Sequence, residues 1–477
     1  LRVSIDEAYG LYDATGLAGL VVSNEVKVAE LVEVAIARIE AQNSRLNAVV
    51  LPAFADARDR ARAGVPAGPL HGVPYLVKDL NTNVAGLPST NGSRALRHVV
   101  PTVDSVLVGR MRDAGLVVLG KTNTPEMGMG ICTSPALRGP TPNPFDPTRS
   151  AGGSSGGSAC AVASGMLPAA HATDSGGSIR IPASNCGLFG LKPTRGRVPL
   201  GNDAAEGLDG LSTSHAVTHS VRDSALLLDV THGPFPGSPP DIAAVPSPAS
   251  GFVDAIDGPL RPLRVALWTE GLADELVDEA CRTAACQAAG LVEVLGCSVV
   301  EVRPPVDGWA VREALSAVFA ANVHVTVAGI LQVHPDGDPT DLFEPATLAA
   351  YHHGRRIGPD DHRRAVDELH RTARAMERFF EDYDILLTPT LAAPARPLGM
   401  MDMGGSDWPT YISAMLDEIP FTPLFNVTGG PAASVPLGRC SSGLPVGIQI
   451  GAAFGNEATV LRLARGFEEA APWHDRI

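Results

Sequence analysis

The segment from residue 139 to residue 187 constrains the fold of this chain more than any other part of the sequence. It is rich in glycine, serine and alanine and carries little charge. A flexible linker can have such a composition, but residues 159–167 and 179–191 carry too much apolar surface to remain in water. The segment is therefore expected to lie inside a folded domain, and its glycines to serve close packing or chemistry.

Short apolar runs and helical patterns alternate on both sides of this segment, in the βαβ rhythm of a sheet covered by helices. Strands are expected at 73–77, 116–119, 264–268, 298–302, 384–387, 432–437 and 446–450. Helices are expected at 24–42, 52–63, 104–114, 274–295 and 457–471, and over most of the region that leads to about 380. The predicted fold class is α/β, with a mixed, twisted central sheet and helices on both faces. Residues 232–262, rich in proline and glycine, predict an exposed connection between two parts of one fold.

Charge and composition exclude several kinds of partner. The net charge of -15 repels phosphate backbones and anionic lipids, and no basic run offsets it. No uninterrupted apolar run reaches the roughly 18 residues that a membrane span needs, and the first ten residues lack a signal-peptide pattern. The sequence therefore predicts a soluble, cytoplasmic protein with no nucleic-acid or membrane partner; a homodimer is left open.

The cysteines and histidines show no metal-ligand pattern. The seven cysteines are odd in number and stand mostly in apolar surroundings, which predicts buried thiols in a reducing compartment. Cys281 and Cys286 have the wrong spacing for a ligand pair, and no HExxH motif is present. We therefore expect no catalytic metal and no cofactor.

Two serines flanked by glycines are the strongest chemical signal. Ser154 lies in the run Gly152-Gly153-Ser154-Ser155-Gly156, and Ser178 in Asp174-Ser175-Gly176-Gly177-Ser178-Ile179-Arg180. Glycines let a substrate approach the backbone, and the N–H groups beside a nucleophilic hydroxyl can hold an oxyanion. Tight turns and close helix packing explain such glycines equally well. A phosphate-binding loop does not, because no Gly-Lys-Ser/Thr follows.

A nucleophilic serine needs a base, and three residues are candidates. His71 and His171 stand near the relevant segments, but a turn before a strand and an apolar strand end give both a structural interpretation. Lys78 ends the apolar run 73–77, where a dry environment would leave its amine neutral and able to accept a proton. A lysine at a strand end is nevertheless most often a solvated surface residue. These residues alone leave the choice open.

Taken together, the motifs resemble the amidase signature family. The resemblance spans nearly the whole chain and lies in Gly72-Val73-Pro74-Tyr75-Leu76-Val77-Lys78-Asp79, Gly120-Lys121-Thr122-Asn123-Thr124-Pro125-Glu126, the two serine segments, Gly190-Leu191-Lys192-Pro193-Thr194-Arg195-Gly196, Thr388-Pro389-Thr390 and Gly443-Leu444-Pro445-Val446-Gly447-Ile448-Gln449. It implies a single domain over 1–477, with a signature core at about 70–200. It also implies a variable helical region at about 305–430 that shapes the substrate pocket.

The resemblance also implies the roles of individual residues in amide hydrolysis. Ser178 would be the acylated nucleophile, Lys78 the general base, and Ser154, after a cis Gly153–Ser154 peptide, the proton relay between them. Backbone N–H groups of Ser175, Gly176, Gly177 and Ser178 would form the oxyanion hole. The implied supporting residues are Gly153, Ser155, Asp174 and Arg180, the last two as an ion pair, and Gly128 would contact the substrate.

Within the family the pattern is similar to bacterial amidases of the 6-aminohexanoate cyclic-dimer hydrolase type. That subgroup has a cysteine in its helical substrate region, where this chain has Phe319-Ala320-Ala321-Asn322. The expected substrate is thus a small linear or cyclic amide. Two alternatives are a glutaminase subunit of a tRNA-dependent amidotransferase and a non-catalytic binding protein on the same fold.

Overall fold

The computed structural model describes residues 4–201, 204–235 and 247–473. In these residues eleven strands form one sheet: β1 (Val49–Pro52), β2 (Pro74–Lys78), β3 (Val117–Thr122), β4 (Ala169–Asp174), β5 (Phe189–Lys192), β6 (Thr213–Thr218), β7 (Arg264–Leu267), β8 (Ser298–Glu301), β9 (Ile385–Pro389), β10 (Ala432–Arg439) and β11 (Pro445–Gly451). The strand order is β1-β3-β2-β4-β6-β5-β10-β11-β9-β7-β8.

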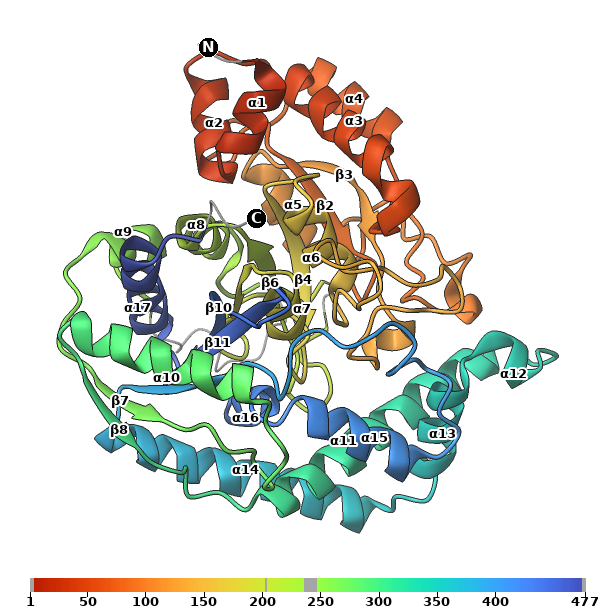
Figure 1. Cartoon of the computed structure of the whole chain (residues 1–477). Helices are drawn as coiled ribbons and strands as arrows, with labels where there is room; N and C mark the ends of the chain where they lie inside the picture. The colour runs from red at the N-terminus through yellow and green to blue at the C-terminus, as the bar shows by residue number, and fades with distance from the viewer. Residues whose placement is uncertain (1–3, 202–203, 236–246, 474–477) are drawn as a thin grey trace.

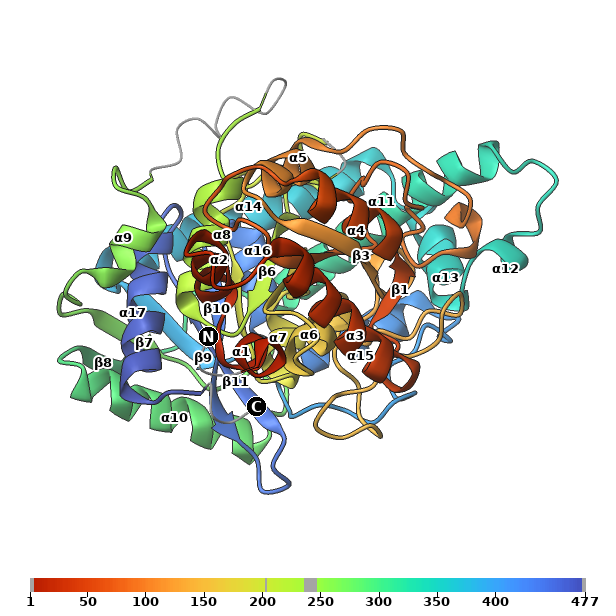
Figure 2. The same cartoon turned by 90° about the horizontal axis from the view of Figure 1, so that it is seen from above.

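Seventeen α-helices accompany the sheet in the same residues: α1 (Ile5–Leu11), α2 (Ala14–Val22), α3 (Val28–Leu46), α4 (Phe54–Ala63), α5 (Val106–Asp113), α6 (Gly156–Ala163), α7 (Arg180–Asn185), α8 (Val221–Thr231), α9 (Phe252–Asp257), α10 (Glu279–Val294), α11 (Gly308–Gln332), α12 (Pro339–Leu342), α13 (Pro345–Gly354), α14 (Pro359–Asp382), α15 (Trp408–Glu418), α16 (Thr422–Thr428) and α17 (Glu457–Ala470). They cover the sheet on both faces (Figures 1 and 2). The predicted α/β class, with a mixed sheet between helices, is confirmed.

The sheet is mixed because it contains both parallel and antiparallel strand pairs. β3, β2 and β4 run parallel, as do β9, β7 and β8, whereas β4 to β9 are joined through antiparallel pairs. β2 and β3 are joined through α5, which is the βαβ unit that the sequence predicts. Ser105 caps the start of α5, and Gly115, at φ 95°, follows its end. All residues of β2 and β3 are buried, as expected of central strands that helices cover on both faces.

One continuous hydrophobic core runs from Ala8 to Trp473. The closing helix α17 contributes Val460, Leu463 and Phe467, as its apolar spacing predicts. Helices α1–α4 lie together at the top of Figure 1, and α3 and α4 pack on β3. Helix α11 packs on α13, α14 and α15; α11, α13 and α15 lie at the lower right of Figure 1, and α14 runs along the bottom. Helices α11 to α14 correspond to the helical region expected before about 380.

The connection predicted at 232–262 differs in part from the structure. Residues 236–246 lie outside the described residues, but the following stretch contains α9, whose Phe252 and Ile256 are buried. Helix α9 packs on α8 and α17. The prediction of an exposed connection is therefore wrong for residues 252–257. Their small apolar face is too short to show a helical period in a sequence rich in proline and glycine.

One other prediction from composition needs correction. Cys286 is exposed and Cys440 is partly exposed, so only five of the seven cysteines are buried. Cys286 lies on the exposed side of the amphipathic helix α10, and Cys440 lies in the turn between β10 and β11, so apolar neighbours in sequence do not ensure burial. In addition, α11 is long and apolar enough to cross a membrane by length and composition, with a mean hydropathy of 1.8 over 18 residues, of which 33% are buried. Helix α11 packs on α13, α14 and α15 in the fold.

Candidate active site

The amine of Lys78 lies at the buried end of β2 and contacts only hydroxyl groups among the described side chains. Its Nζ is 2.7 Å from Ser154 Oγ, 2.9 Å from Ser155 Oγ and 2.8 Å from Thr173 Oγ1. Its side chain is fully buried. Burial lowers the pKa of Lys78 well below the ordinary value for lysine, and the charge of Asp174 opposes this shift without cancelling it. Burial thus favours the neutral form of this amine.

Ser154 stands at the start of the segment that leads into α6, where two glycines leave it room. The Gly153–Ser154 peptide bond is cis, as the family resemblance implies. A Cβ on Gly153 would lie 2.6 Å from the carbonyl oxygen of Gly130, so no larger residue fits there. A Cβ on Gly128 would lie 3.3 Å from Ser154 Oγ and would collide with the Leu80 side chain. Gly128 therefore keeps the space in front of the Ser154 hydroxyl open.

Ser178 lies in the loop between β4 and α7, and its side chain is partly exposed. Ser154 and Ser178 both border a cavity of about 430 Å³. The described hydrogen bonds include the link between Lys78 and Ser154 but none from the Ser178 hydroxyl. The structure therefore brings Ser154 and Ser178 to one cavity and places the buried Lys78 amine beside Ser154, which shows one of the two links of a proton relay.

Asp174 and Arg180 organise the loop that carries Ser178. Arg180 donates from Nε and Nη2 to the Asp174 carboxylate at 3.0 and 2.9 Å, and both side chains are fully buried. Burial opposes the charged carboxylate, but the charge and hydrogen bonds of Arg180 hold the pKa of Asp174 at about 2. Asp174 also accepts from the backbone N–H groups of Gly177 and Ile179. The loop that carries Ser178 therefore folds around the Asp174 carboxylate.

The four N–H groups expected to form an oxyanion hole are not equivalent. The Gly177 N–H donates to Asp174 Oδ1 at 2.8 Å and is therefore already engaged. The described hydrogen bonds use none of the N–H groups of Ser175, Gly176 and Ser178. Thr422 Oγ1 donates to the Gly176 carbonyl at 2.7 Å and fixes the loop from the side of α16. Three of the four predicted donors remain available to a ligand.

The two histidines considered as alternative bases lie in structural positions. His171 is fully buried inside β4, and its Nδ1 accepts the backbone N–H of Lys78 at 3.3 Å. Burial is the main cause that lowers the pKa of His171, to about 3. His71 contacts the Pro66 carbonyl through Nδ1. Neither ring contacts Ser154 or Ser178 in the described hydrogen bonds.

Four residues of the site were missed by the sequence analysis: Thr173, Thr422, Asn426 and Gln449. Thr173 contacts Lys78, and the other three hold Arg180 or the nucleophile loop. Gln449 left a signal, because a polar residue inside the apolar run 446–450 needs a buried partner. Thr422 and Asn426 left none, since their partners are more than 240 residues away in sequence.

The walls of the cavity are mainly apolar. Helices α11 and α15 supply Phe319, Val323, Met415 and Ile419, and the segment 200–212 supplies further residues. In the described residues no group of three or more His, Cys, Asp or Glu side chains has the arrangement to hold a metal ion. The cavity therefore suits a compact, largely apolar molecule that reaches Ser178.

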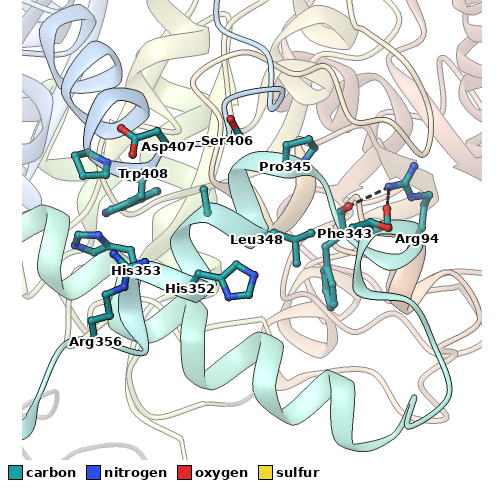
Figure 3. A pocket seen from close by; sticks show the side chains of 13 residues that line it. Arg94, Phe343, Pro345, Leu348, His352, His353, Arg356, Ser406, Asp407 and Trp408 are labelled. Atoms are coloured by element: carbon teal, nitrogen blue, oxygen red, sulfur yellow. Dashed lines mark hydrogen bonds between the residues drawn. The ribbon is translucent and has the colours of Figure 1, made fainter.

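A second hollow of about 790 Å³ lies beyond Trp408, which borders both spaces. Figure 3 shows His352, His353, Arg356 and Asp407 around it, with Arg94 bonded to the carbonyls of Thr340 and Phe343. None of the predicted catalytic residues lines this second hollow. It is a separate feature of the helical region.

Comparison with known proteins agrees with this geometry. The family model Amidase matches residues 30–461. The 6-aminohexanoate-cyclic-dimer hydrolase of Paenarthrobacter ureafaciens is 37% identical over 97% of this chain and 95% of that protein. The acylamidase of Rhodococcus erythropolis is 35% identical over 97% and 96%. A solved structure of 6-aminohexanoate cyclic dimer hydrolase with substrate has a TM-score of 0.90, at 35% identity over 97% of this chain and 98% of that one.

The mixed α/β sheet, its cavity and the similarity to known proteins define this chain as a hydrolase. The chain belongs to the amidase family. It is an amidase, an enzyme that hydrolyses carboxylic amide bonds.

Proposed function

We propose that this amidase acts through an acyl-enzyme on Ser178, with Lys78 as general base and Ser154 as proton relay. The observation that supports this most strongly is the fully buried Lys78 amine, 2.7 Å from Ser154 Oγ and bordered by hydroxyls. A charged ammonium would be costly there, and the described residues offer no carboxylate within ion-pair distance. A neutral amine can take a proton from a hydroxyl.

In the proposed reaction, one proton passes from Ser178 to Lys78 and is then returned to the departing nitrogen. Ser178 Oγ attacks the amide carbon, and its proton passes through Ser154 to Lys78. When the tetrahedral intermediate collapses, the C–N bond breaks and the proton returns from Lys78 through Ser154 to the departing nitrogen. Water then hydrolyses the ester to a carboxylic acid and restores Ser178.

The developing oxyanion would be held by the nucleophile loop. Of its four N–H groups, those of Ser175, Gly176 and Ser178 have no acceptor in the described residues, and that of Gly177 supports the loop through Asp174. Preorganised N–H donors at this position stabilise the transition state more than the substrate. Gly153, Ser155, Asp174 and Arg180 are supporting residues in this proposal, and Gly128 faces the substrate.

The substrate is proposed to be a small linear or cyclic amide. The helical region at about 305–430 is proposed to determine the shape of the pocket that binds it. The protein is proposed to work in the cytoplasm, without a cofactor, metal, nucleic acid or membrane, as a monomer or homodimer. Light scattering after size-exclusion chromatography would determine the assembly. Fractionation of cells that express the full-length protein would test the compartment.

The experiment that tests the mechanism is fluorophosphonate labelling combined with a screen of aryl, aliphatic, cyclic and peptide amides. We expect one label per chain, on Ser178, and no label or turnover in Ser178→Ala. Glutamine hydrolysis that depends on added partner subunits would instead favour the amidotransferase subunit. An unlabelled wild-type protein that binds amides without cleaving them would favour the binding protein.

A further inference from the structure

Among the described residues, Trp408 is the one side chain that borders both the cavity of Ser178 and the second hollow. These spaces measure about 430 and 790 Å³, yet Trp408 is only 3% exposed. Such a large side chain can be this well covered between two hollows only if its indole fills the boundary between them. Trp408 therefore separates the two spaces. The proposed mechanism gives it no role.

Two helices place the indole at one end of the catalytic cavity. Trp408 is the first residue of α15, and Met415 and Ile419, which follow it at helical spacing, also border the cavity. On α11, Phe319 borders the cavity, and Ser316, one turn earlier, accepts the indole N–H of Trp408 through Oγ at 3.1 Å. The cavity-facing side of α15 thus ends at Trp408, and this hydrogen bond holds the indole against α11.

The space beyond the indole can receive an apolar chain. Phe343, Leu348 and Ala349 line the second hollow together with Trp408, and Figure 3 shows the first two of them beside it. A methylene chain that moves from water onto such apolar surface gains free energy. The charged Arg356 at the same hollow is exposed to water. Removal of the indole would therefore join the two spaces into one longer channel with apolar walls.

We propose that Trp408 determines the maximum length of the substrate. The part of the amide that points toward the start of α15 must end before the indole, and the second hollow is a continuation of the substrate path that Trp408 closes. This inference rests on the proposed function, because it places the amide in the cavity that Ser178 borders. Trp408 contacts the end of the substrate and takes no part in proton transfer.

The test measures kcat/KM for two series of amides that grow by one methylene at a time. In one series the acyl chain of a p-nitroanilide grows, and in the other an acetanilide carries a growing 4-alkyl group, so that each half of the amide is extended in turn. In one of the series, we expect kcat/KM of the wild-type protein to rise by at most about fourfold per methylene. It should then fall by roughly tenfold at the methylene that meets the indole.

The variants test whether the chain enters the second hollow. Trp408→Ala should move the length limit by several methylenes and leave the shortest amides unchanged, and Trp408→Leu should move it less. The double variant Trp408→Ala/Ala349→Phe fills the second hollow again and should bring the limit back toward that of the wild type, which a mere loss of packing would not do. Trp473→Ala removes an indole that is also buried but borders neither space, and this matched control should keep the wild-type limit.

The outcome distinguishes this inference from the mechanism it depends on. If neither series shows a limit in the wild-type protein, or if Trp408→Ala leaves the limit in place, the role of Trp408 is wrong while Ser178 remains the nucleophile. A limit that does not return in the double variant would overturn the role of the second hollow. Turnover by Ser178→Ala would instead overturn the mechanism itself. Should Trp408→Ala fail to fold, as thermal unfolding would reveal, Trp408→Leu alone and combined with Ala349→Phe still decides the question.

Discussion

At the scale of single residues, the hydroxyls around Lys78 restrict how its amine can be oriented. Ser155 Oγ donates to the Thr173 carbonyl at 3.2 Å and accepts the Thr173 N–H at 3.3 Å, so toward Lys78 it can only accept. A neutral amine has two hydrogens and one lone pair. If Thr173 Oγ1 accepts the second hydrogen, the lone pair faces Ser154. This is the orientation that a base for the Ser154 proton needs.

The first prediction concerns the protonation of Lys78. Because burial lowers its pKa, the neutral base should dominate at lower pH than for a free lysine. The ammonium has no lone pair, so kcat/KM for an anilide should rise with pH and level off above that lowered pKa. A pH–rate profile measures it. Lys78→Ala should cost amides about 10²- to 10⁴-fold and activated phenyl esters less, since a phenolate leaves without a proton.

Ser154→Ala is expected to show the same bias toward esters, to a smaller degree. Near-normal amide turnover by Lys78→Ala at neutral pH would contradict the lysine mechanism. It would require another base, although neither His171 nor His71 contacts the two serines in the described hydrogen bonds.

The second prediction tests the orientation of the amine. Thr173→Val keeps the shape of the side chain and removes the hydroxyl 2.8 Å from Lys78 Nζ. Lys78 can then donate to Ser155 and Ser154, which turns its lone pair away from the relay. We expect kcat for amides to fall roughly fivefold with little change in KM, because one hydrogen bond is worth about 1 kcal/mol. An unchanged kcat would show that Thr173 does not orient the amine.

At the scale of elements, Arg180 joins the nucleophile loop to the C-terminal part of the sheet. All five of its N–H donors are used: two bond the Asp174 carboxylate, and the others bond the Thr422 carbonyl, Gln449 Oε1 and Asn426 Oδ1. The acceptors come from β4, α16 and β11. A planar fork with five donors is a property of arginine alone.

The third prediction follows from that geometry. Arg180→Lys keeps the charge but has three donors for five acceptors, so buried oxygen atoms lose their partners. We expect the free energy of unfolding to fall by about 2–5 kcal/mol and kcat to fall as the nucleophile loop loosens. Chemical denaturation and anilide kinetics measure the two effects. A surface replacement such as Arg371→Lys is the control, and an Arg180→Lys protein as stable as wild type would contradict the argument.

The fourth prediction concerns the acid stability of the same loop. The pKa of Asp174 is held at about 2 in the fold, below its unfolded value. The native state thus binds fewer protons, so the stability that Asp174 contributes is complete above about pH 4 and is lost as the pH falls toward 2. Asp174→Asn should be less stable at pH 7 and lose less further stability between pH 4 and pH 2. Equal slopes in urea unfolding across that range would contradict this.

The sequence predicted the helices and strands better than it predicted the tertiary contacts between them. Strands with uninterrupted apolar runs, such as β2 and β11, and helices with a regular apolar face, such as α17, were expected at nearly their observed bounds. Helix α9 was missed because two buried residues in a proline-rich stretch give no period. Of the site, the residues in glycine-rich motifs were found. Thr422 and Asn426 act through partners distant in sequence, which local patterns do not encode.

At the scale of the whole molecule, the sheet joins two halves of the chain. Strands β1 to β6, from the first half of the chain, occupy one side of the sheet, from the edge strand β1 to β5. Strands β7 to β11, from the second half, occupy the other side, from β10 to the edge strand β8. The halves meet where β5 pairs with β10, and the buried Arg180 donates across that boundary. Helix α17 of the second half packs on α8 of the first. One hydrophobic core covers both.

The fifth prediction is that neither half works alone. A fragment of residues 1–235 contains Lys78, Ser154 and Ser178, but it lacks Thr422, Asn426 and Gln449, which hold the nucleophile loop from the other half. Its strand β5 would also expose an apolar edge that β10 normally covers. We therefore expect this fragment to remain unlabelled by a fluorophosphonate and to aggregate.

Co-expression with residues 247–477 should restore labelling of Ser178. The contacts that the first fragment lacks, those of Arg180 with α16 and β11, join residues that are present in the two fragments. Labelling intensity relative to the intact chain measures the recovery, with Ser178→Ala in the first fragment as the control. If the 1–235 fragment alone were labelled as fast as the intact protein, the first half would be an independent catalytic domain. The buried contacts of Arg180 with α16 and β11 would then be dispensable for the nucleophile loop.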